Sequence, residues 1–428
     1  MGIDMSYRYR LLDSDLRKDL QAMGAVLIEG VKGCGKTTTG EQLAKSALYL
    51  GSGRTRENTL ERLGYNPAGV LAGTAPKLID EWQVIPQLWD DVRFEVDHRQ
   101  RPGQFVLTGS ALPADRSEIL HTGTGRFARL KMRTMSLFES GDSNGAVSVK
   151  ALFDGENDFA GENPLSIDRI AFLICRGGWP QAINQSNDAA LKLSYQYLDA
   201  IVNTDVSKVD NVSRTPKKVR QFLKTYAKNV GLQTAITDIR LQLLKDKAIK
   251  SFDERTCYSY AEALQKIFVI EEMKAWNPNL RSKTAIRTSD TRYFTDPAIG
   301  AAALRIGPQD LLNDPKTFGF LFENLCIRDL RVYADVLDGD VFHYRDKNGL
   351  ECDAVLHRRN GTYGLIEIKL GGQYAIDHGA ETLHALAEKI NTKQMAHPSF
   401  LMVLVGVGNS AYKRRDGVWV VPIGCLKP

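Results

Sequence analysis

Apolar positions in the first part of the chain follow two spacings. Residues 9–20 repeat with a helical period and lead into an apolar run at 25–28, which predicts a helix followed by a strand. A second helix is predicted after this strand, with four apolar side chains on one face: Leu43, Ala44, Ala47 and Leu48. The polar, glycine-containing segment 51–58 is typical of a loop.

Two further apolar runs end in polar residues. The run at 76–83 predicts a short apolar strand that ends in the carboxylates of Asp80 and Glu81, and residues 105–110 predict a strand that ends in the hydroxyls of Thr108 and Ser110. Ligands bind at the carboxyl ends of the strands in open α/β sheets, so these side chains are expected near one edge. We therefore expect an α/β fold for residues 1–160.

The middle of the chain is expected to be helical. Residues 161–212 indicate a helical connector with a break at 176–180. Three helices, two apolar strands and the segment between those strands then indicate a winged helix-turn-helix at 213–300. That segment carries three basic residues that would contact phosphates in a DNA-binding module: Arg281, Lys283 and Arg287. A rigid spacer or a partner-docking unit is the alternative.

Residues 301–428 combine helices and strands, and compact linkers are expected near residues 160 and 300. A strand at 350–356 carries Asp353, and a strand at 363–369 carries Glu367 and Lys369, which share one face because they are two residues apart. A two-residue loop between the strands would point Asp353 to the other face. A three-residue loop at 360–362 would pair Asp353 with Lys369, so we predict an odd-numbered loop or a bulge.

A glycine-rich segment follows the first strand. Gly30, Gly35, Lys36 and Thr37 have the spacing G-x-x-x-x-G-K-[ST] of a phosphate-binding loop, between a strand and a helix. In such a loop backbone N–H groups hold phosphate oxygens, the lysine reaches the β and γ phosphates, and the threonine binds Mg²⁺. The residues expected to bind ATP here are Gly30, Val31, Lys32, Gly33, Cys34, Gly35, Lys36, Thr37 and Thr38. An exposed glycine-rich turn is the alternative.

The polar strand ends complete a site for ATP hydrolysis. Asp80 is expected to hold the Mg²⁺ shell together with Thr37, and Glu81 to orient and deprotonate the attacking water. Thr108 and Ser110 are candidate sensors of the γ-phosphate, unless they only form a turn.

An arginine in the glycine-flanked loop at 122–126 is a candidate finger. Arg126 could stabilise transition-state charge in its own chain or in a neighbouring subunit. Three other arginines compete for this role: Arg101, Arg116 and Arg129.

These motifs resemble the prokaryotic AAA-type ATPases that carry a C-terminal domain of unknown function with a restriction-endonuclease-like end. Residues 30–39, 79–83, 107–110 and 125–126 carry the resemblance, which extends over nearly the whole chain. It implies a homo-oligomer, of which a hexameric ring is one form. Val31 and Lys32 stand where the family has Pro-Arg, a change that a backbone phosphate cradle tolerates.

The C-terminal residues resemble the PD-(D/E)xK nucleases. In that arrangement Asp353 and Glu367 hold Mg²⁺, Lys369 steadies the attacking water or the transition state, and Glu323 from the helix at 318–331 assists. An ordinary α/β domain with surface acids is the alternative. Two histidines near the hairpin are expected to be solvated or packed rather than metal ligands: His343 and His357.

Composition narrows these expectations only slightly. A net charge of +5 over 428 residues is compatible with nucleic acid without arguing for it. The six cysteines form no C-x-x-C pair, so neither a zinc site nor a disulfide framework is indicated. No signal peptide or membrane span is expected, which favours a cytoplasmic protein with no membrane partner.

Two functions fit these expectations. The first is a Mg²⁺-dependent ATPase that is coupled to the binding or processing of DNA or RNA. The second is an ATP-dependent switch or scaffold that remodels a protein partner and has a non-cleaving nuclease-like domain.

Overall fold

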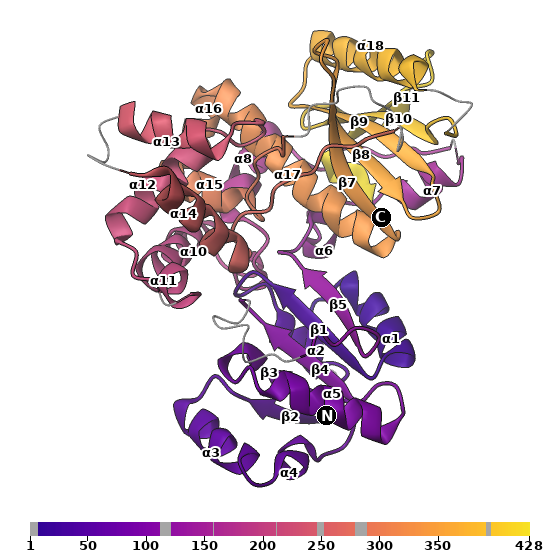
Figure 1. The fold of residues 1–428 in the computed structure, drawn as a ribbon. Coiled ribbons are helices and arrows are strands. Elements are labelled where there is room, and N and C mark those ends of the chain that lie inside the picture. The colour runs from indigo at the N-terminus through magenta and orange to yellow at the C-terminus, as the bar shows by residue number, and fades with distance from the viewer. Residues whose placement is uncertain are drawn as a thin grey trace. The chain divides into compact units, whose positions relative to one another are not determined.

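The computed structural model describes residues 7–111, 121–156, 158–210, 212–245, 252–278, 289–390 and 395–428. The chain falls into two units, which are described separately (Figure 1). Unit 1 comprises Met1–Thr134, Ile201–Arg214 and Glu262–Val269, and unit 2 comprises Met135–Ala200, Thr215–Ala261 and Ile270–Pro428. Among the described residues, no helix is both long and apolar enough to cross a bilayer.

Unit 1 contains a parallel five-stranded sheet in the order β2–β3–β4–β1–β5, which confirms the expected α/β fold. Its strands are β1 (Ala25–Gly30), β2 (Ser46–Tyr49), β3 (Lys77–Asp80), β4 (Phe105–Gly109) and β5 (Phe127–Met132). Ile79 and Leu107 belong to an apolar cluster on one face, whereas a Cβ at Gly40 would lie 2.9 Å from Leu78 on the other. Burial of both faces explains the continuous apolar runs.

Short helices surround this sheet: α1 (Leu12–Ala22), α2 (Lys36–Glu41), α3 (Gly53–Leu63), α4 (Pro67–Leu71), the 3-10 helix η1 (Trp82–Val84) and α5 (Leu88–Arg99). The Trp89 ring stacks on Phe127 with ring centroids 4.0 Å apart, and it also contacts Trp82. These aromatic side chains fill the core on the side of the sheet that contacts α5.

Two local expectations for unit 1 are wrong. Ala47 and Leu48 lie on β2 rather than on a helix, because they pair with Leu78 and Ile79 in the parallel ladder and this tertiary pairing overrides a helical spacing. The expected loop at 51–58 instead forms most of α3. Thr59 is the buried residue of that helix, so it has no apolar stripe for a periodicity argument to detect.

Unit 2 begins with a largely helical part. Its helices are α6 (Leu137–Ser140), α7 (Val149–Phe153), α8 (Ile167–Arg176), α9 (Pro180–Ile183), α10 (Asn187–Ala200), α12 (Pro216–Ala227), α13 (Ile236–Lys245), α15 (Pro297–Leu304) and α16 (Pro308–Asn313), and α14 (Glu254–Lys266) begins in this unit. The π-helix η2 (Ile201–Asp205) and α11 (Val206–Lys208) follow α10 in the chain and belong to unit 1. The predicted break at 176–180 is confirmed, since α8 ends there and Pro180 starts α9.

The predicted wing does not form regular strands among the described residues. Two isolated antiparallel bridges, Ile270 with Phe294 and Met273 with Thr291, take its place, in keeping with the marginal stability of a lone two-stranded ribbon. The winged helix therefore remains a prediction, and its basic residues lie outside the described part of the chain: Arg281, Lys283 and Arg287. The expected linker near residue 300 is wrong, because Gly300 lies within the buried helix α15.

The C-terminal part of unit 2 is a mixed six-stranded sheet in the order β11–β12–β10–β9–β8–β7. Its strands are β7 (Gly339–Arg345), β8 (Glu351–Arg358), β9 (Tyr363–Lys369), β10 (Phe400–Val405), β11 (Tyr412–Lys413) and β12 (Trp419–Pro422). Helices α17 (Pro315–Val336) and α18 (Gln373–Lys389) pack against it, and β6 (Val147–Ser148) pairs with β13 (Leu426–Lys427) in a separate ribbon. The 3-10 helix η3 (Ile423–Cys425) precedes β13.

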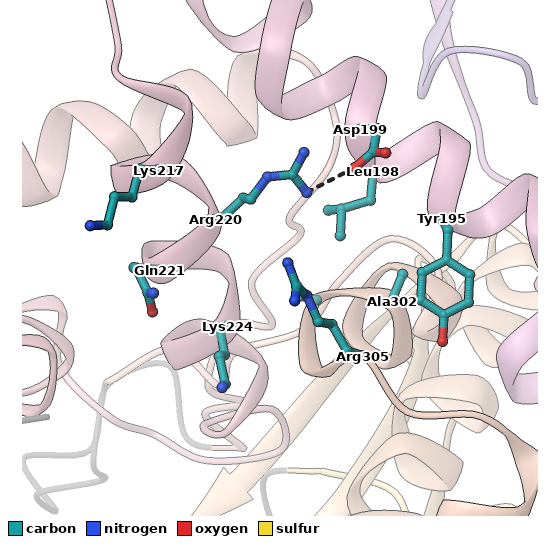
Figure 2. Close-up of a pocket in the computed structure, with 10 residues that line it drawn as sticks. Tyr195, Leu198, Asp199, Lys217, Arg220, Gln221, Lys224, Ala302 and Arg305 are labelled. Atoms are coloured by element: carbon teal, nitrogen blue, oxygen red, sulfur yellow. Dashed lines mark ion pairs between the residues drawn. The ribbon is translucent and has the colours of Figure 1, made fainter. Parts of the chain in front are cut away.

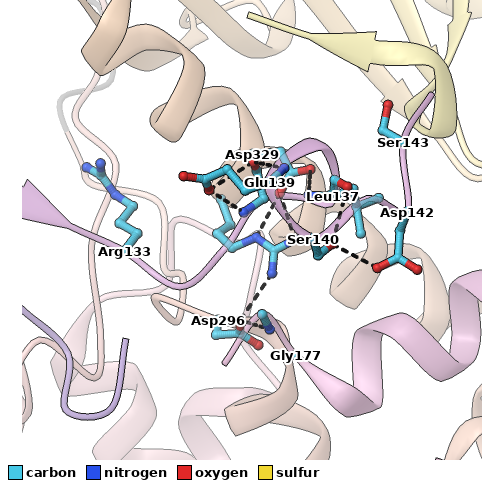
Figure 3. A network of polar contacts seen from close by, with 12 residues as sticks. Arg133, Leu137, Glu139, Ser140, Asp142, Ser143, Gly177, Asp296 and Asp329 are labelled. Carbon is cyan, nitrogen blue, oxygen red and sulfur yellow. Dashed lines mark hydrogen bonds and ion pairs between the residues drawn. The ribbon is translucent and has the colours of Figure 1, made fainter. Parts of the chain in front are cut away.

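A buried charged network connects three helices of unit 2 (Figure 3). Arg328 on α17 donates to Asp329 at 2.8 Å and to Asp296 at 3.1 Å. Asp329 also accepts from the Leu137 N–H at the start of α6, and Asp296 caps α15 and accepts from the Gly178 N–H. The single guanidinium group thus neutralises two carboxylates that have no exposed surface.

Candidate functional site

The phosphate-binding loop joins β1 to α2 in unit 1. A Cβ atom at Gly30 would lie 2.0 Å from the carbonyl oxygen of Met132, so only glycine fits. Gly35 is the N-cap of α2 and has a φ of +106°, a conformation that L side chains rarely adopt. The two glycines therefore allow the tight path that leads into the helix N-terminus.

Lys36 is buried beneath this loop, with 5% of its surface exposed. Its ammonium group donates to the carbonyl oxygens of Gly30 and Val31, both at 2.9 Å. Within the described part of the chain, no carboxylate forms an ion pair with Lys36. A buried cation with only neutral acceptors favours a site for an anion such as phosphate.

Three predicted residues meet where the loop approaches β3 and β4. Thr37 Oγ1 donates to Asp80 Oδ1 at 2.7 Å, and Thr108 Oγ1 donates to the same oxygen at 2.6 Å. The parallel register pairs Asp80 with Thr108, which explains their approach. A hydroxyl and a carboxylate oxygen in contact are suitable oxygen ligands for Mg²⁺.

Glu81 follows Asp80 in a strained backbone conformation, with φ +59° and ψ +43°. Its carboxylate accepts from Ser110 Oγ at 3.0 Å and from the side-chain amide of Gln83. The Glu81 N–H donates to Thr108 Oγ1 at 3.3 Å. The strand ends thus bring the proposed base and both hydroxyl residues together, as expected for this sheet edge.

The arginine candidates have different surroundings in unit 1. Arg126 donates to Asp97 at 2.8 Å, and this hydrogen bond lowers the pKa of Asp97. Arg129 lies over the ring of Trp89 and 3.6 Å from Glu29. Arg116 lies outside the described residues, and the assignment of a finger remains a prediction.

Sequence reasoning missed a set of contacts that supports the loop from the N-terminal segment. Arg10 donates to the carbonyl oxygen of Cys34 at 2.7 Å and to that of Arg133 at 2.9 Å. The Tyr7 hydroxyl contacts Thr39 at 2.9 Å, next to the phosphate-binding motif. No local pattern signals these contacts, because they join residues that are far apart in the chain.

Lys32, which was expected among the nucleotide-binding residues, pairs through its side chain with Asp205 at 3.2 Å. Its side chain is exposed, so a phosphate-binding role for it would require this surface ion pair to open. Thr38, also expected there, has an exposed side chain.

A second cluster lies in unit 2 where β8 and β9 pair. Lys369 Nζ donates to Glu367 at 2.6 Å and to Asp353 at 3.2 Å. Asp353 also accepts from the backbone N–H of Ile368 at 2.7 Å. Three of the four residues predicted for a nuclease-like site are thus in direct contact.

The register of this hairpin corrects one detail of the prediction. His357 pairs with Tyr363, and the Arg358 N–H donates to the Thr362 carbonyl, so the loop has three residues, 359–361. The odd number is confirmed, but the loop begins one residue earlier than predicted, and the register places Asp353 opposite Glu367. Gly361 determines this position, because its φ of +90° suits the left-handed end of a three-residue loop.

Glu323 on α17 interacts electrostatically with Asp353, Glu367 and Lys369. Burial, followed by the charge of Asp353, raises the pKa of Glu323 to about 8. The same two causes raise the pKa of Glu367 to about 8. Burial alone would lower the pKa of Lys369, but the carboxylates of Asp353 and Glu367 outweigh it and raise that pKa.

The carboxylates of this cluster are chemically suited to bind a divalent cation, but their present geometry is not that of a metal site. Three acids share one lysine, so an added positive charge would relieve their repulsion. The Glu323 carboxylate accepts a hydrogen bond from the Tyr293 hydroxyl, a partner that the sequence did not indicate. Within the described ranges, no group of three or more acidic, histidine or cysteine side chains is arranged to hold a metal ion. His343 is buried between Gln233 and the Ser289 carbonyl, as expected for a packed histidine.

Three segments of the chain match models of known protein families. Residues 23–140 match the family model of an AAA domain, and residues 167–310 and 318–426 match two domains of unknown function, DUF8612 and DUF4143. This match supports a P-loop AAA-type ATPase domain in the first part of the chain, in agreement with the expected class.

Two curated mycobacterial relatives are described as uncharacterized proteins, one from Mycobacterium tuberculosis and one from Mycobacterium bovis. Each is 23% identical over 356 residues, which cover 83% of this chain and 72% of the relative.

Solved structures show a looser likeness. A Walker-type ATPase of Pyrococcus abyssi matches with a TM-score of 0.41 and 14% identity, over 72% of this chain and 100% of that one. The ORC2 protein of Aeropyrum pernix, solved as ADPNP and ADP complexes, matches with a TM-score of 0.33 and 13% identity, over 63% of this chain and 90% of that one. At these scores the residues of this chain must carry the functional argument.

Proposed function

We propose that unit 1 binds ATP and hydrolyses it in a Mg²⁺-dependent reaction. The observation that carries the proposal is the direct contact of Thr37 with Asp80, beside Glu81. In this assignment Thr37 and Asp80 hold Mg²⁺, whose charge would offset that of the phosphates. Glu81 orients and deprotonates the attacking water, and the backbone N–H groups of the loop hold phosphate oxygens.

The surroundings of Lys36 support nucleotide binding independently of the acids. Its ammonium group is buried, and its acceptors among the described residues are the carbonyl oxygens of Gly30 and Val31 and the thiol sulfur of Cys34, none of which carries a charge that balances it. Phosphate oxygens would supply the missing counter-charge, as the phosphate-binding lysine does in P-loop proteins. Thr108 and Ser110 contact Asp80 and Glu81, so a change at the γ-phosphate could reach β4 through these hydroxyls.

The test compares E81Q and K36A with wild type in nucleotide binding and phosphate release. E81Q should bind ATP with near-normal affinity and lose at least about 100-fold in turnover, because only the base is removed. K36A should lose binding itself. E57Q, at an exposed glutamate of α3, is the matched control and should behave as wild type. Continued hydrolysis by E81Q would remove Glu81 from the role of base.

The output of the ATPase is proposed to be nucleic-acid binding or processing by unit 2. Metal-dependent phosphodiester cleavage is a second candidate activity, favoured by the contacts of Lys369 with Asp353 and Glu367. An ATP-dependent switch that remodels a protein partner is the alternative. In that case the same carboxylate cluster has a structural role.

Incubation with plasmid, single-stranded DNA and RNA, under Mg²⁺ or Mn²⁺ and with or without ATP, separates these outputs. Cleavage that is lost in K369A and D353N but retained in K347A, a control at an exposed lysine of the β7–β8 turn, supports a nuclease. If wild type neither binds nor cuts any of them, the switch is favoured.

The ATPase is also proposed to act as a homo-oligomer with Arg126 as a finger. In the isolated chain Arg126 pairs with Asp97, so a role in a neighbouring site requires this exposed pair to open. Exposed ion pairs contribute little to stability, so opening this pair costs little free energy. A monomer in sedimentation analysis, at concentrations that support full turnover, would refute a role in trans.

A further inference from the structure

We propose that a basic pocket in the helical part of unit 2 binds the phosphate backbone of a single nucleic-acid strand (Figure 2). The pocket has a volume of about 530 Å³ and lies among α10, α12 and α15. Nucleic-acid binding there does not require ATP hydrolysis or the carboxylate cluster. It also differs from the wing, where the sequence predicted phosphate contacts.

Three cations of the pocket lie on one face of α12. Lys217, Arg220 and Lys224 are separated by three and four residues, a spacing that places side chains on the same side of a helix. Lys224 lies seven positions after Lys217, which corresponds to about 10 Å at the rise of an α-helix. Lys218, next in sequence, lies over the ring of Phe252 instead. Three basic residues of α12 therefore line the pocket, whereas Lys218 on the same helix contacts Phe252 and does not.

A fourth cation comes from the end of α15. Arg305 is the C-cap of this helix and has a φ of +61°, a left-handed conformation that usually belongs to glycine. Figure 2 shows its side chain extending toward that of Arg220 across the pocket. An arginine that occupies a strained position and faces other cations is poorly explained by folding alone.

The pocket has a large excess of positive charge. Its one acidic lining residue, Asp199, pairs with Arg220 at 2.8 Å, and both side chains are substantially exposed. Lys217, Lys224 and Arg305 are exposed, and no carboxylate of the described chain pairs with them. Four basic groups against one acid give a local excess of three, within a chain whose net charge is only +5. This concentration identifies the ligand as an anion.

The shape of the charge distribution favours a strand over a small anion. One phosphate group contacts one or two cations, whereas a nucleic-acid strand presents a row of phosphates and can follow cations that extend over about 10 Å. The ring of Tyr195 also lines the pocket, with its hydroxyl bonded to the Ile306 carbonyl at 3.0 Å. An anchored, partly exposed ring next to cations is the combination on which single-stranded bases stack.

The test measures binding of a labelled single-stranded oligonucleotide by fluorescence anisotropy over a range of salt, without ATP or divalent cations. K217A/K224A should bind several-fold more weakly, and its plot of log K against log salt should be shallower by about 1.4, for two lost phosphate contacts. R305G should also weaken binding, although glycine suits the left-handed position and should leave thermal stability unchanged or higher. K218A, the control on the same helix, should match wild type.

A variant that is expected to bind more tightly distinguishes loss of a contact from loss of folding. D199N removes the pocket's acid and frees Arg220, so it should bind the oligonucleotide more tightly than wild type. K36A, with its nucleotide site disabled, should bind the oligonucleotide normally, which separates this proposal from the ATPase. Unchanged affinity and salt slope in K217A/K224A, or an equal loss in K218A, would overturn it. So would binding of tripolyphosphate but of no DNA or RNA strand by wild type.

Discussion

The carboxylate cluster of unit 2 should make stability depend on pH in an uncommon direction. Glu323 and Glu367 have pKa values near 8 in the folded protein, against an ordinary value of 4.5. Between these values the folded state retains protons that the unfolded state releases. The free energy of unfolding should therefore fall as pH rises from about 5 to about 8 and then level off, whereas ordinary salt-bridged carboxylates act in the opposite direction.

The size of this effect follows from the two shifts. A displacement of 3.5 units, from 4.5 to about 8, corresponds to roughly 5 kcal/mol for one group. The two acids repel each other and share Lys369, so their contributions are coupled and the two figures do not simply add. The contacts of Lys369 with Asp353 and Glu367 limit the loss by neutralising part of the charge.

Urea unfolding at several pH values between about 6 and 9, with chelator or Mg²⁺, is the assay. Hydrogen exchange in β9 follows the cluster locally, because Glu367 and Lys369 both lie on that strand. E367Q should flatten the pH profile, since an amide has no proton to lose. If the cluster holds a cation, Mg²⁺ should stabilise wild type more at high pH, where the ligands are ionised.

Two results would refute this reasoning. One is a pH profile of E367Q and E323Q that runs parallel to that of wild type. The other is stability that rises with pH through the same range. E57Q, on the exposed surface of unit 1, controls for the loss of any one glutamate.

Three further predictions concern buried polar contacts. R328M leaves Asp296 and Asp329 without a counter-ion and should lower the free energy of unfolding by about 3–5 kcal/mol in urea titrations, whereas R328M/D296N/D329N should recover part of that loss. R10M removes the donors to the phosphate-binding loop and should cost about 1.5–3 kcal/mol in thermal unfolding and raise KM for ATP in turnover assays. T108V removes a donor to the Asp80 carboxylate and should lower kcat more than ATP affinity. Phosphate release measures kcat, and equilibrium binding measures the affinity. Wild-type behaviour of any of these variants would show that its contact is dispensable.

The pocket on α12 and the carboxylate cluster would give unit 2 two kinds of contact with nucleic acid. The pocket would hold a strand by its charge, and the cluster would act on a phosphodiester bond if it binds a metal ion. The two can be separated experimentally, because K217A/K224A should reduce binding whereas K369A should reduce only cleavage. Loss of both properties in either variant would indicate a shared structural role.

Local sequence alone predicted the proposed nucleotide-binding loop of this protein. A phosphate-binding loop needs glycines, a lysine and a hydroxyl residue within eight positions, and this spacing is visible without a fold. The apolar runs that carry Asp80 and Thr108 also indicated their strands, because burial on both faces of a parallel sheet requires continuous apolar sequence. The parallel register then brought both side chains to Thr37.

Tertiary structure decided the features that depend on contacts between distant segments. Ala47 and Leu48 form a strand because β3 offers a partner, although their spacing also fits a helix. The hairpin of Asp353 depends on where Gly361 can take a left-handed conformation. Its loop begins one residue earlier than predicted, which moves the partner of Asp353 by two residues, from Lys369 to Glu367. The pocket of Arg220 and Arg305 exists only because α12 and α15 pack together. The sequence of one helix gives no sign that the arginine of the other lies beside it.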